Sequence, residues 1–393
     1  MFNRNTVMTI AASLLFSTIA SAQVTSYPGT PVDLLREGKT VKANIQQVVP
    51  KEALPGEKIP FLSRSDRGER YLVNGTIVNY MARAKDTGGM YEIATITGGK
   101  GAGQPVHHHS EHFIALYLME GEADLWLNGE HFLMRKGDFA NVPANTDYGF
   151  RFNRHRTKML AWYSGPGLLD TYKALGEPTD LYIQPDHAKV DWSAQTTKRA
   201  EAAGDITFAK DAYPRGEAKK ITRKELPKKV MPYTIAADEG RKFVGGPEYF
   251  SMLASQQTTG GRFFVVITQA PQTPMVPRHY HALHSENFFG LEGEVDLIVN
   301  HSKATLKAGD LAAVPAGTIH AYSMTQPYNR FIGFLTPGLF QNFFEILGDE
   351  GYDANVYPAK PHELRFDRVI KELESLDLHI VEDDMRAEEA AKK

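Results

Sequence analysis

The sequence predicts an all-β protein that contains two similar barrels in tandem, with short flanking helices. Apolar runs of strand length recur at a spacing of roughly 8–12 residues, which is typical of β-barrels and β-sandwiches. One block of sequence also recurs with an offset of 172 residues, the separation of His107 and His279. In both copies a short helical segment follows a Pro-Gly pair. We therefore expect one barrel per copy.

The repeat needs no gap across its matched stretch, so the differences between the copies can be compared position by position. Glycines, prolines, aspartates and histidines coincide. The pairs are Pro105 and Pro277, His107 and His279, His109 and His281, Gly121 and Gly293, Asp124 and Asp296, Gly137 and Gly309, Asp138 and Asp310, and Pro143 and Pro315. Two positions differ in chemical type: Ile114 stands opposite Glu286, and Tyr148 stands opposite His320.

The expected strands follow from the apolar runs and from the turn residues between them. In the first copy they cover residues 90–96, 113–118, 123–127, 131–134 and 158–164, with Asn128-Gly129 predicting a tight hairpin. In the second copy they cover residues 262–268, 287–291, 295–299, 311–314 and 330–335. The helices after the Pro-Gly pairs are expected at 168–175 and 339–347. Residues 98–103 are glycine-rich but lack the end of a phosphate-binding loop, so a plain connection is expected.

The predicted organisation has five parts. Residues 1–22 resemble a secretory signal peptide, with Arg4, an apolar stretch and the small residues Ala20-Ser21-Ala22. The first barrel domain covers 23–185, beginning with an extended arm, and a polar connector covers 186–229. A helix is expected in the connector at 192–203, ended by Gly204. The second barrel domain covers 230–365, and 366–393 forms a charged tail that begins with an amphipathic helix. The expected location is periplasmic or secreted.

Composition limits the partners and the metal chemistry. The formal net charge of −3 over 393 residues gives no electrostatic sign of a nucleic-acid partner. No apolar run is long enough to cross a membrane well, so no membrane partner is expected. The chain has no cysteine, which excludes disulfides and thiolate metal sites. The sequence leaves open whether the chain forms a homo-oligomer.

The second copy carries four candidate metal ligands: His279, His281, Glu286 and His320. His279 and His281 are two residues apart, so on a strand both side chains point to one face. Glu286 follows on a neighbouring strand, and His320 comes from another strand after a turn with Pro315 and Gly317. Three imidazoles and a carboxylate suit one divalent first-row metal: copper, iron, manganese, nickel and cobalt all fit.

These residues resemble the double motif of the cupin superfamily. His-x-His-x4-Glu-x6-Gly spans His279 to Gly293, and Gly-Asp-x4-Pro-x-Gly-x-x-His spans Gly309 to His320. The repeat implies a bicupin, with two double-stranded β-helix (jelly-roll) barrels. The stretches 279–289 and 335–344 look similar to flavonol (quercetin) 2,3-dioxygenases. Fungal members of that family hold their metal in the first half, whereas the complete ligand set here lies in the second.

The first copy is predicted to be degenerate. His107 and His109 keep their places, Glu111 comes three residues too early for the motif carboxylate, and Tyr148 replaces the last histidine. A second, weak metal site built from His107, His109 and Tyr148, with Glu111 or His112 assisting, is the less favoured interpretation. A barrel kept for packing is the favoured one.

The resemblance implies a dioxygenase that uses O2 as co-substrate and cleaves a small aromatic substrate, releasing carbon monoxide and leaving a depside. Glu286 is then expected to be the catalytic base, taking the proton of the substrate's 3-hydroxyl group. The candidates for an apolar wall around a flat substrate are Phe288, Phe264, Tyr249 and Met275.

Three other interpretations stay open. Bicupins with this ligand set also decarboxylate or oxidise oxalate, and others cleave further aromatic or dicarbonyl compounds. Oxalate sites usually place an arginine three residues before the first motif histidine, where this chain has Val276 and Gln104. Arg278 precedes a ligand directly and is expected to point to the opposite strand face. A binding or storage cupin without catalysis is the non-enzyme alternative.

Overall fold

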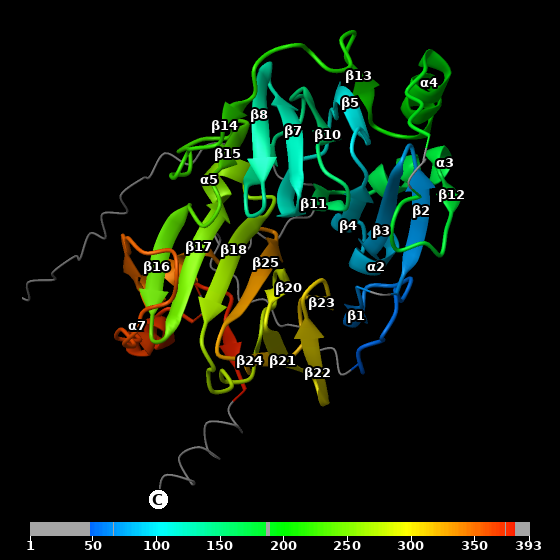
Figure 1. Ribbon diagram of the computed structural model, residues 1–393. Coiled ribbons are helices and arrows are strands. Elements are labelled where there is room, and N and C mark those ends of the chain that lie inside the picture. The colour runs from blue at the N-terminus through cyan, green and yellow to red at the C-terminus, as the bar shows by residue number, and fades with distance from the viewer. Residues whose placement is uncertain (1–47, 66, 186–188, 374, 382–393) are drawn as a thin grey trace, which may run out of the picture.

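The computed structural model describes residues 48–65, 67–185, 189–373 and 375–381, and they form two β-barrels stacked on each other (Figure 1). The expected signal peptide, most of the N-terminal arm and the end of the charged tail lie outside the described residues, so the predicted location stays a prediction. The all-β prediction with two tandem barrels is confirmed.

Each barrel consists of an eight-stranded sheet and a smaller one. In the first barrel the larger sheet has the order β12 (Glu177–Pro178), β2 (Glu69–Val73), β3 (Thr76–Ala82), β4 (Tyr91–Gly98), β11 (Thr157–Ser164), β6 (Ile114–Glu120), β9 (Phe139–Val142) and β15 (Tyr233–Ile235). The smaller sheet has the order β13 (Thr207–Phe208), β5 (Gly103–His108), β10 (Tyr148–Phe152), β7 (Glu122–Leu127), β8 (Glu130–Arg135) and β14 (Lys219–Lys220).

The second barrel repeats this plan. Its larger sheet has the order β1 (Phe61–Ser63), β23 (Leu311–Val314), β20 (Ser285–Glu292), β25 (Asn329–Thr336), β18 (Phe264–Ala270), β17 (Glu248–Ala254), β16 (Arg241–Gly245) and β26 (Asp349–Glu350). Its smaller sheet has the order β22 (Ser302–Lys307), β21 (Glu294–Val299), β24 (His320–Met324), β19 (His279–Tyr280) and β27 (His379–Ile380). The offset of 172 residues relates β1 to β15 and β13 to β27, so the repeat extends well beyond the motifs.

The short edge strands are exchanged between the halves. Strand β1, from the arm before the first barrel, pairs with β23 of the second barrel. Strand β15, at the start of the second copy, pairs with β9 of the first. Strands β13 and β14 come from the predicted connector and pair with β5 and β8 of the first barrel. The predicted boundaries at 185, 229 and 365 stay predictions, but strand pairing crosses the one at 229.

The two larger sheets pack face to face through a shared apolar core. It draws Phe61, Trp162 and Phe263 from both halves, and the rings of Trp162 and Phe263 lie 4.2 Å apart. Because side chains alternate along a strand, β20 sends Phe289 into this shared core and Phe288 into the interior of its own barrel. Glu286, two residues before Phe288, therefore also points into the second barrel.

The helices are short. They are α2 (Ala84–Thr87), α3 (Leu168–Leu175), α4 (Ala194–Ala203), α5 (Gln256–Thr259), α6 (Gln341–Leu347) and α7 (Phe366–Lys371). Helices α3, α4, α6 and α7 lie close to their expected places, and α2 and α5 were not predicted. Helix α4 ends at Gly204 as predicted. Helix α7 buries Val369 and ends at Lys371, and Leu376 is buried in the segment beyond it.

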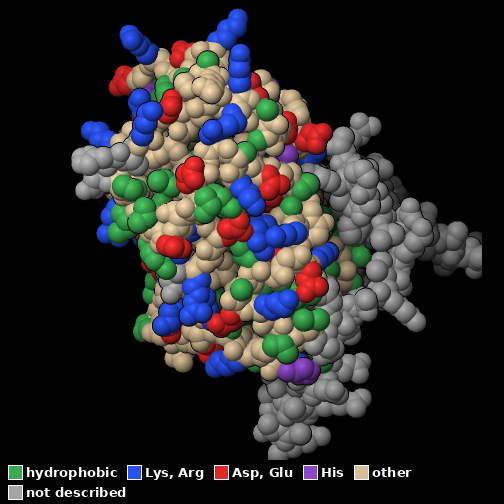
Figure 2. Space-filling view, turned by 90° about the vertical axis from the view of Figure 1, so that its right-hand side faces the viewer, with side chains coloured by type: hydrophobic (Ala, Val, Ile, Leu, Met, Phe, Trp, Pro, Cys, Tyr) green, Lys and Arg blue, Asp and Glu red, His purple; other side chains and the backbone are tan. Residues whose placement is uncertain are grey.

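One face of the molecule carries charges of both signs. On the face in Figure 2, Lys and Arg side chains are interspersed with Asp and Glu side chains. Among the helices of the described ranges, none is both long and apolar enough to span a bilayer. The expected absence of nucleic-acid partners stays a prediction.

Candidate metal centre and pocket

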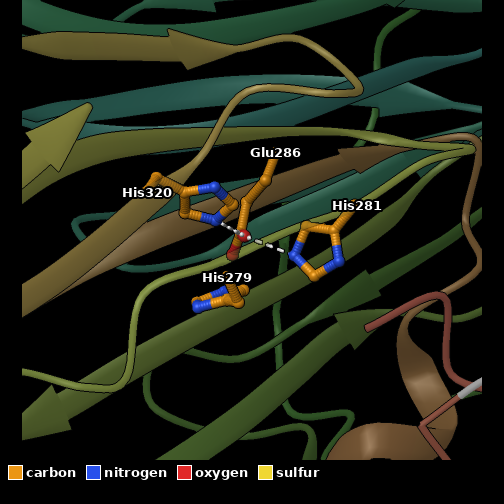
Figure 3. Close-up of side chains that lie close together, drawn as sticks. All are labelled: His279, His281, Glu286 and His320. Carbon is orange, nitrogen blue, oxygen red and sulfur yellow. Dashed lines mark hydrogen bonds and ion pairs between the residues drawn. The ribbon is translucent and has the colours of Figure 1, made fainter. Parts of the chain in front are cut away.

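The four predicted ligands meet inside the second barrel. Strands β19 and β24 pair with His279 directly opposite His320, and β20 supplies Glu286 from the facing sheet. One donor atom from each of the three histidines and the glutamate lies within 4.8 Å of all the others. Figure 3 shows the three rings arranged around the Glu286 carboxylate. The sequence therefore placed these four side chains together correctly.

Backbone carbonyls fix the tautomer of all three imidazoles. Nδ1 of His279 donates to the Pro277 carbonyl at 2.8 Å, Nδ1 of His281 to the Asp377 carbonyl at 2.8 Å, and Nδ1 of His320 to the Thr318 carbonyl at 3.0 Å. A carbonyl only accepts, so each Nδ1 carries the proton. Each neutral ring is left with an Nε2 lone pair, which is the arrangement found in metal-bound histidines.

This donor set fits a cation. Oε2 of Glu286 lies 3.2 Å from Nε2 of His281 and 3.1 Å from Nε2 of His320. Burial holds the pKa of His279 well below its ordinary value and lowers that of His281 to about 4, which disfavours imidazolium rings as the partners of the carboxylate. Because each Nε2 presents a lone pair, these two contacts set acceptor against acceptor unless a cation lies between them. Converging lone pairs and an ionised carboxylate favour a bound divalent metal.

One residue of the C-terminal segment, Asp377, fixes the loop that begins at His281, and we call its set of hydrogen bonds the clasp. Besides the contact of its carbonyl with His281, Asp377 accepts hydrogen bonds at its carboxylate from Ala282 N, Leu283 N and His284 Nδ1, each at 2.8 Å. Burial alone would raise the pKa of Asp377, but hydrogen bonds from His284 and His379 hold it well below its ordinary value. Asp377 therefore orients His281 from a point almost 100 residues away in sequence.

The first barrel keeps the clasp without the ligand set. Asp205, 172 residues before Asp377, accepts at its backbone carbonyl from His109 Nδ1, and at its carboxylate from Ser110 N, Glu111 N and His112 Nδ1. A carboxylate-bearing clasp is thus a feature of both copies. It was not predicted, although the offset of 172 would have revealed it.

The three side chains of the predicted second site lie together, with Tyr148 in the place that His320 takes in the other barrel. His109 Nε2 lies 3.2 Å from the Tyr148 hydroxyl, and burial keeps the pKa of Tyr148 well above its ordinary value, so the phenol stays neutral. Nδ1 of His107 donates to Pro105 O at 2.7 Å, the same contact that Nδ1 of His279 makes with Pro277 O, so His107 also keeps an Nε2 lone pair. Of the two assisting residues, Glu111 is exposed, and both ring nitrogens of His112 already have partners. These contacts favour the packing interpretation, and the weak site stays a prediction.

A pocket of about 380 Å³ opens beside the metal centre, with His279 and Glu286 in its lining. This volume lies in the usual range for small-molecule sites. Most of its wall is apolar and aromatic. The apolar side chains include Met275, Val276, Phe331, Phe340, Phe343, Phe344, Leu364, Phe366, Leu378 and Ile380. The wall is therefore suited to a flat apolar molecule.

Of the four predicted wall residues, Met275 lines the pocket and the other three lie behind it. Tyr249 follows Glu248, which faces the pocket, so alternation along β17 turns the Tyr249 ring away. Phe264 is covered by Phe344, with ring centroids 5.5 Å apart. Phe288 is fully buried and packs against Phe331 at 5.4 Å, which fills the nearer position.

The sequence prediction missed most of the actual wall. Helix α6 contributes Phe343 and Phe344, whose sequence was noted only as part of the resemblance. The C-terminal segment contributes Leu364, Phe366, Leu378 and Ile380. The sequence predicted an amphipathic helix at the start of this tail, but it did not indicate which cavity the segment covers.

Comparison with known proteins identifies the structural class of the chain. The cupin domain family matches residues 95–163 and 265–327, one match in each barrel. A solved structure of Lactobacillus farciminis oxalate decarboxylase has 14% sequence identity and a TM-score of 0.48, covering 74% of this chain and 90% of its own. With one matched cupin domain in each half, the chain is a bicupin.

Two relatives narrow the assignment. A Bacillus subtilis (strain 168) protein named quercetin 2,3-dioxygenase is 36% identical over 329 residues, which is 84% of this chain and 97% of the relative. An Aspergillus japonicus protein of the same name is 26% identical over 145 residues, covering 35% of this chain and 41% of the relative. The chain belongs to the cupin family and, within it, to the bicupins that resemble these dioxygenases.

Proposed function

We propose that this chain is a metal-dependent dioxygenase that cleaves a flavonol-like aromatic hydroxy-ketone with O2. The observation that carries the proposal is a pocket with a largely aromatic wall that opens onto His279 and Glu286. Similarity to two proteins named quercetin 2,3-dioxygenase supports the same reaction. The remaining support comes from what the pocket and the ligand set can do chemically.

The pocket favours a flavonol over a small diacid. None of the described residues that line it is Lys or Arg, whereas Glu248 and Glu286 both face it. A dianion such as oxalate would find no cationic side chain in this wall to pair with it. Val276, where an arginine would serve an oxalate site, contributes an apolar surface instead. A neutral or singly ionised aromatic substrate does not need such a side chain.

His279, His281, His320 and Glu286 would hold the divalent metal. When bound, such a metal acts as a Lewis acid that stabilises negative charge on a coordinated oxygen. The ionised Glu286 carboxylate is placed to accept the proton of the substrate's 3-hydroxyl group, which leaves an enolate. Phe340 packs against His281 with ring centroids 4.7 Å apart and helps to keep water out of this corner of the pocket.

The reaction balances without a further reductant. The two atoms of O2 enter the opened ring, one ring carbon leaves as carbon monoxide, and the rest of the substrate becomes a depside. The residues of the protein bind the flat ring system, remove one proton and exclude water. Copper, iron, manganese, nickel and cobalt all satisfy the donor set, so the proposal does not depend on one metal.

The test is oxygen uptake by the purified, metal-analysed full chain with quercetin, with carbon monoxide measured in the headspace. Stoichiometric O2 consumption and carbon monoxide release are expected. Binding of quercetin without O2 uptake in metal-replete protein would contradict catalysis and support a binding cupin. O2 uptake or CO2 release with oxalate alone would contradict the flavonol assignment.

A further inference from the structure

We propose that Glu248 and Tyr322 form a second polar anchor in the pocket, which hydrogen-bonds a hydroxyl or carbonyl group of the substrate away from the metal centre. The pair would make the enzyme selective for hydroxylated flavonols over the unsubstituted ring system. The inference rests on the proposed flavonol dioxygenase function and adds to it a determinant of substrate choice.

The pair lies in the wall of the same pocket as two of the metal ligands. Glu248 begins β17 and Tyr322 lies on β24, and both line the pocket together with His279 and Glu286. Tyr322 comes two residues after His320, so its side chain points to the same side of the strand. The ring of Tyr322 packs against Phe288 at 5.9 Å and Phe331 at 5.4 Å, which fixes where its hydroxyl group lies.

The pair has hydrogen-bonding capacity left for a ligand. The Tyr322 hydroxyl donates to Oε2 of Glu248 at 3.4 Å, a long contact. Within the described part of the chain, the structure gives no hydrogen-bond partner to Oε1 of Glu248. Glu248 is only 9% exposed, and its surroundings in the pocket are mostly apolar. A buried carboxyl group with one weak partner is costly to keep unless a ligand completes its hydrogen bonds.

The protonation of Glu248 suits this role. Burial raises its pKa to about 7. Near neutral pH a large share of the carboxyl groups is therefore uncharged and able to donate as well as accept a hydrogen bond. Such a group can bind a phenolic hydroxyl or a carbonyl oxygen without bringing a full negative charge close to an enolate.

Comparison of the two barrels shows that the fold does not require Glu248 and Tyr322. At an offset of 172, Thr76 occupies the place of Glu248 and Phe150 the place of Tyr322. Both are buried in the first barrel, and Phe150 belongs to its apolar core. The first barrel thus forms without the pair, and it is also the barrel that lacks counterparts of Glu286 and His320. The polar pair therefore occurs together with the complete metal site.

The test compares quercetin with 3-hydroxyflavone, which keeps the reacting 3-hydroxyl group but lacks the other ring hydroxyls. In metal-replete full chain, Glu248→Leu is expected to lower kcat/KM for quercetin by about 10- to 100-fold, mainly through KM. The value for 3-hydroxyflavone should change by less than about 3-fold. Glu248→Gln, which keeps a donor and an acceptor, should restore the preference for quercetin. Equilibrium binding of both flavonols without O2 should show the same pattern.

Controls separate selectivity from folding. Glu92→Leu removes a different buried carboxyl, one that accepts from Leu169 N in the first barrel, and should lower stability while leaving the ratio between the two flavonols unchanged. If Glu248→Leu does not fold, Tyr322→Phe carries the test, with a smaller shift of the ratio in the same direction.

Two outcomes overturn the inference, and they are distinguishable. An equal fall in kcat/KM for both flavonols, at unchanged metal content, would show that Glu248 supports the pocket without contacting the substrate. Failure of the unmodified, metal-replete chain to bind or turn over either flavonol would refute the proposed function, and the anchor falls with it.

Discussion

Replacing Asp377 by alanine should weaken metal binding although Asp377 is not one of the four ligands. The variant removes the carboxylate that accepts from Ala282 N and Leu283 N, both at 2.8 Å, and from His284 Nδ1. Two backbone N–H groups would lose their partners, at about 1–3 kcal/mol each, so a stability loss of about 2–6 kcal/mol is expected. Because the Asp377 carbonyl also orients His281, displacement of this segment should lower metal affinity about 10- to 100-fold.

Asp205→Ala is the matched control, since Asp205 makes the corresponding contacts in the barrel without the complete ligand set. Metal-free full chain would be titrated with Co2+ against a competing chelator, and urea unfolding would be measured alongside. Both variants should lose stability, and only Asp377→Ala should lose metal affinity. Equal affinity loss in the two variants, or an Asp377→Ala chain that binds Co2+ as the parent does, would refute the reasoning.

Three further predictions concern the pocket and the ligands. The pKa of Glu248 rises on folding from 4.5 to about 7. Its contribution to the free energy of unfolding is therefore complete below pH 4.5, and about 3 kcal/mol of stability is lost as the pH rises through 7. Urea unfolding at pH 5 and 8 should show this slope in the parent and not in Glu248→Gln, and equal slopes would contradict it. Glu286→Gln should lower kcat about 10²- to 10⁴-fold at matched metal content, and unchanged turnover would exclude Glu286 as the base. His320→Tyr, which copies Tyr148, should abolish metal binding while His109→Ala keeps it, as elemental analysis of the folded variants can show; the reverse pattern would place the metal in the first barrel.

The sequence predicted the parts of the site that depend on strand geometry. Two histidines with one residue between them share a face, and the offset between the copies singled out Glu286 and His320 as the positions that differ. Whether a side chain reaches the surface of the pocket was not predictable in this way. The period of a strand gives the side to which a ring points, but not whether another ring lies in front of it, as Phe344 lies in front of Phe264. Contacts made by distant segments were also missed, because the clasp residue Asp377 has no local pattern that connects it with His281.

The exchange of edge strands makes each half of the chain complete the other. Strands β1 and β15 each complete a sheet in the opposite half, as the arms of two separate subunits do in a domain-swapped dimer. An isolated half would carry an open sheet edge, which invites pairing with a second chain. Here a single polypeptide encloses both partners of such a dimer, and each half closes a sheet edge of the other. Ile114 and Tyr148 could then replace a carboxylate and an imidazole without loss of the assembly that supports the other site.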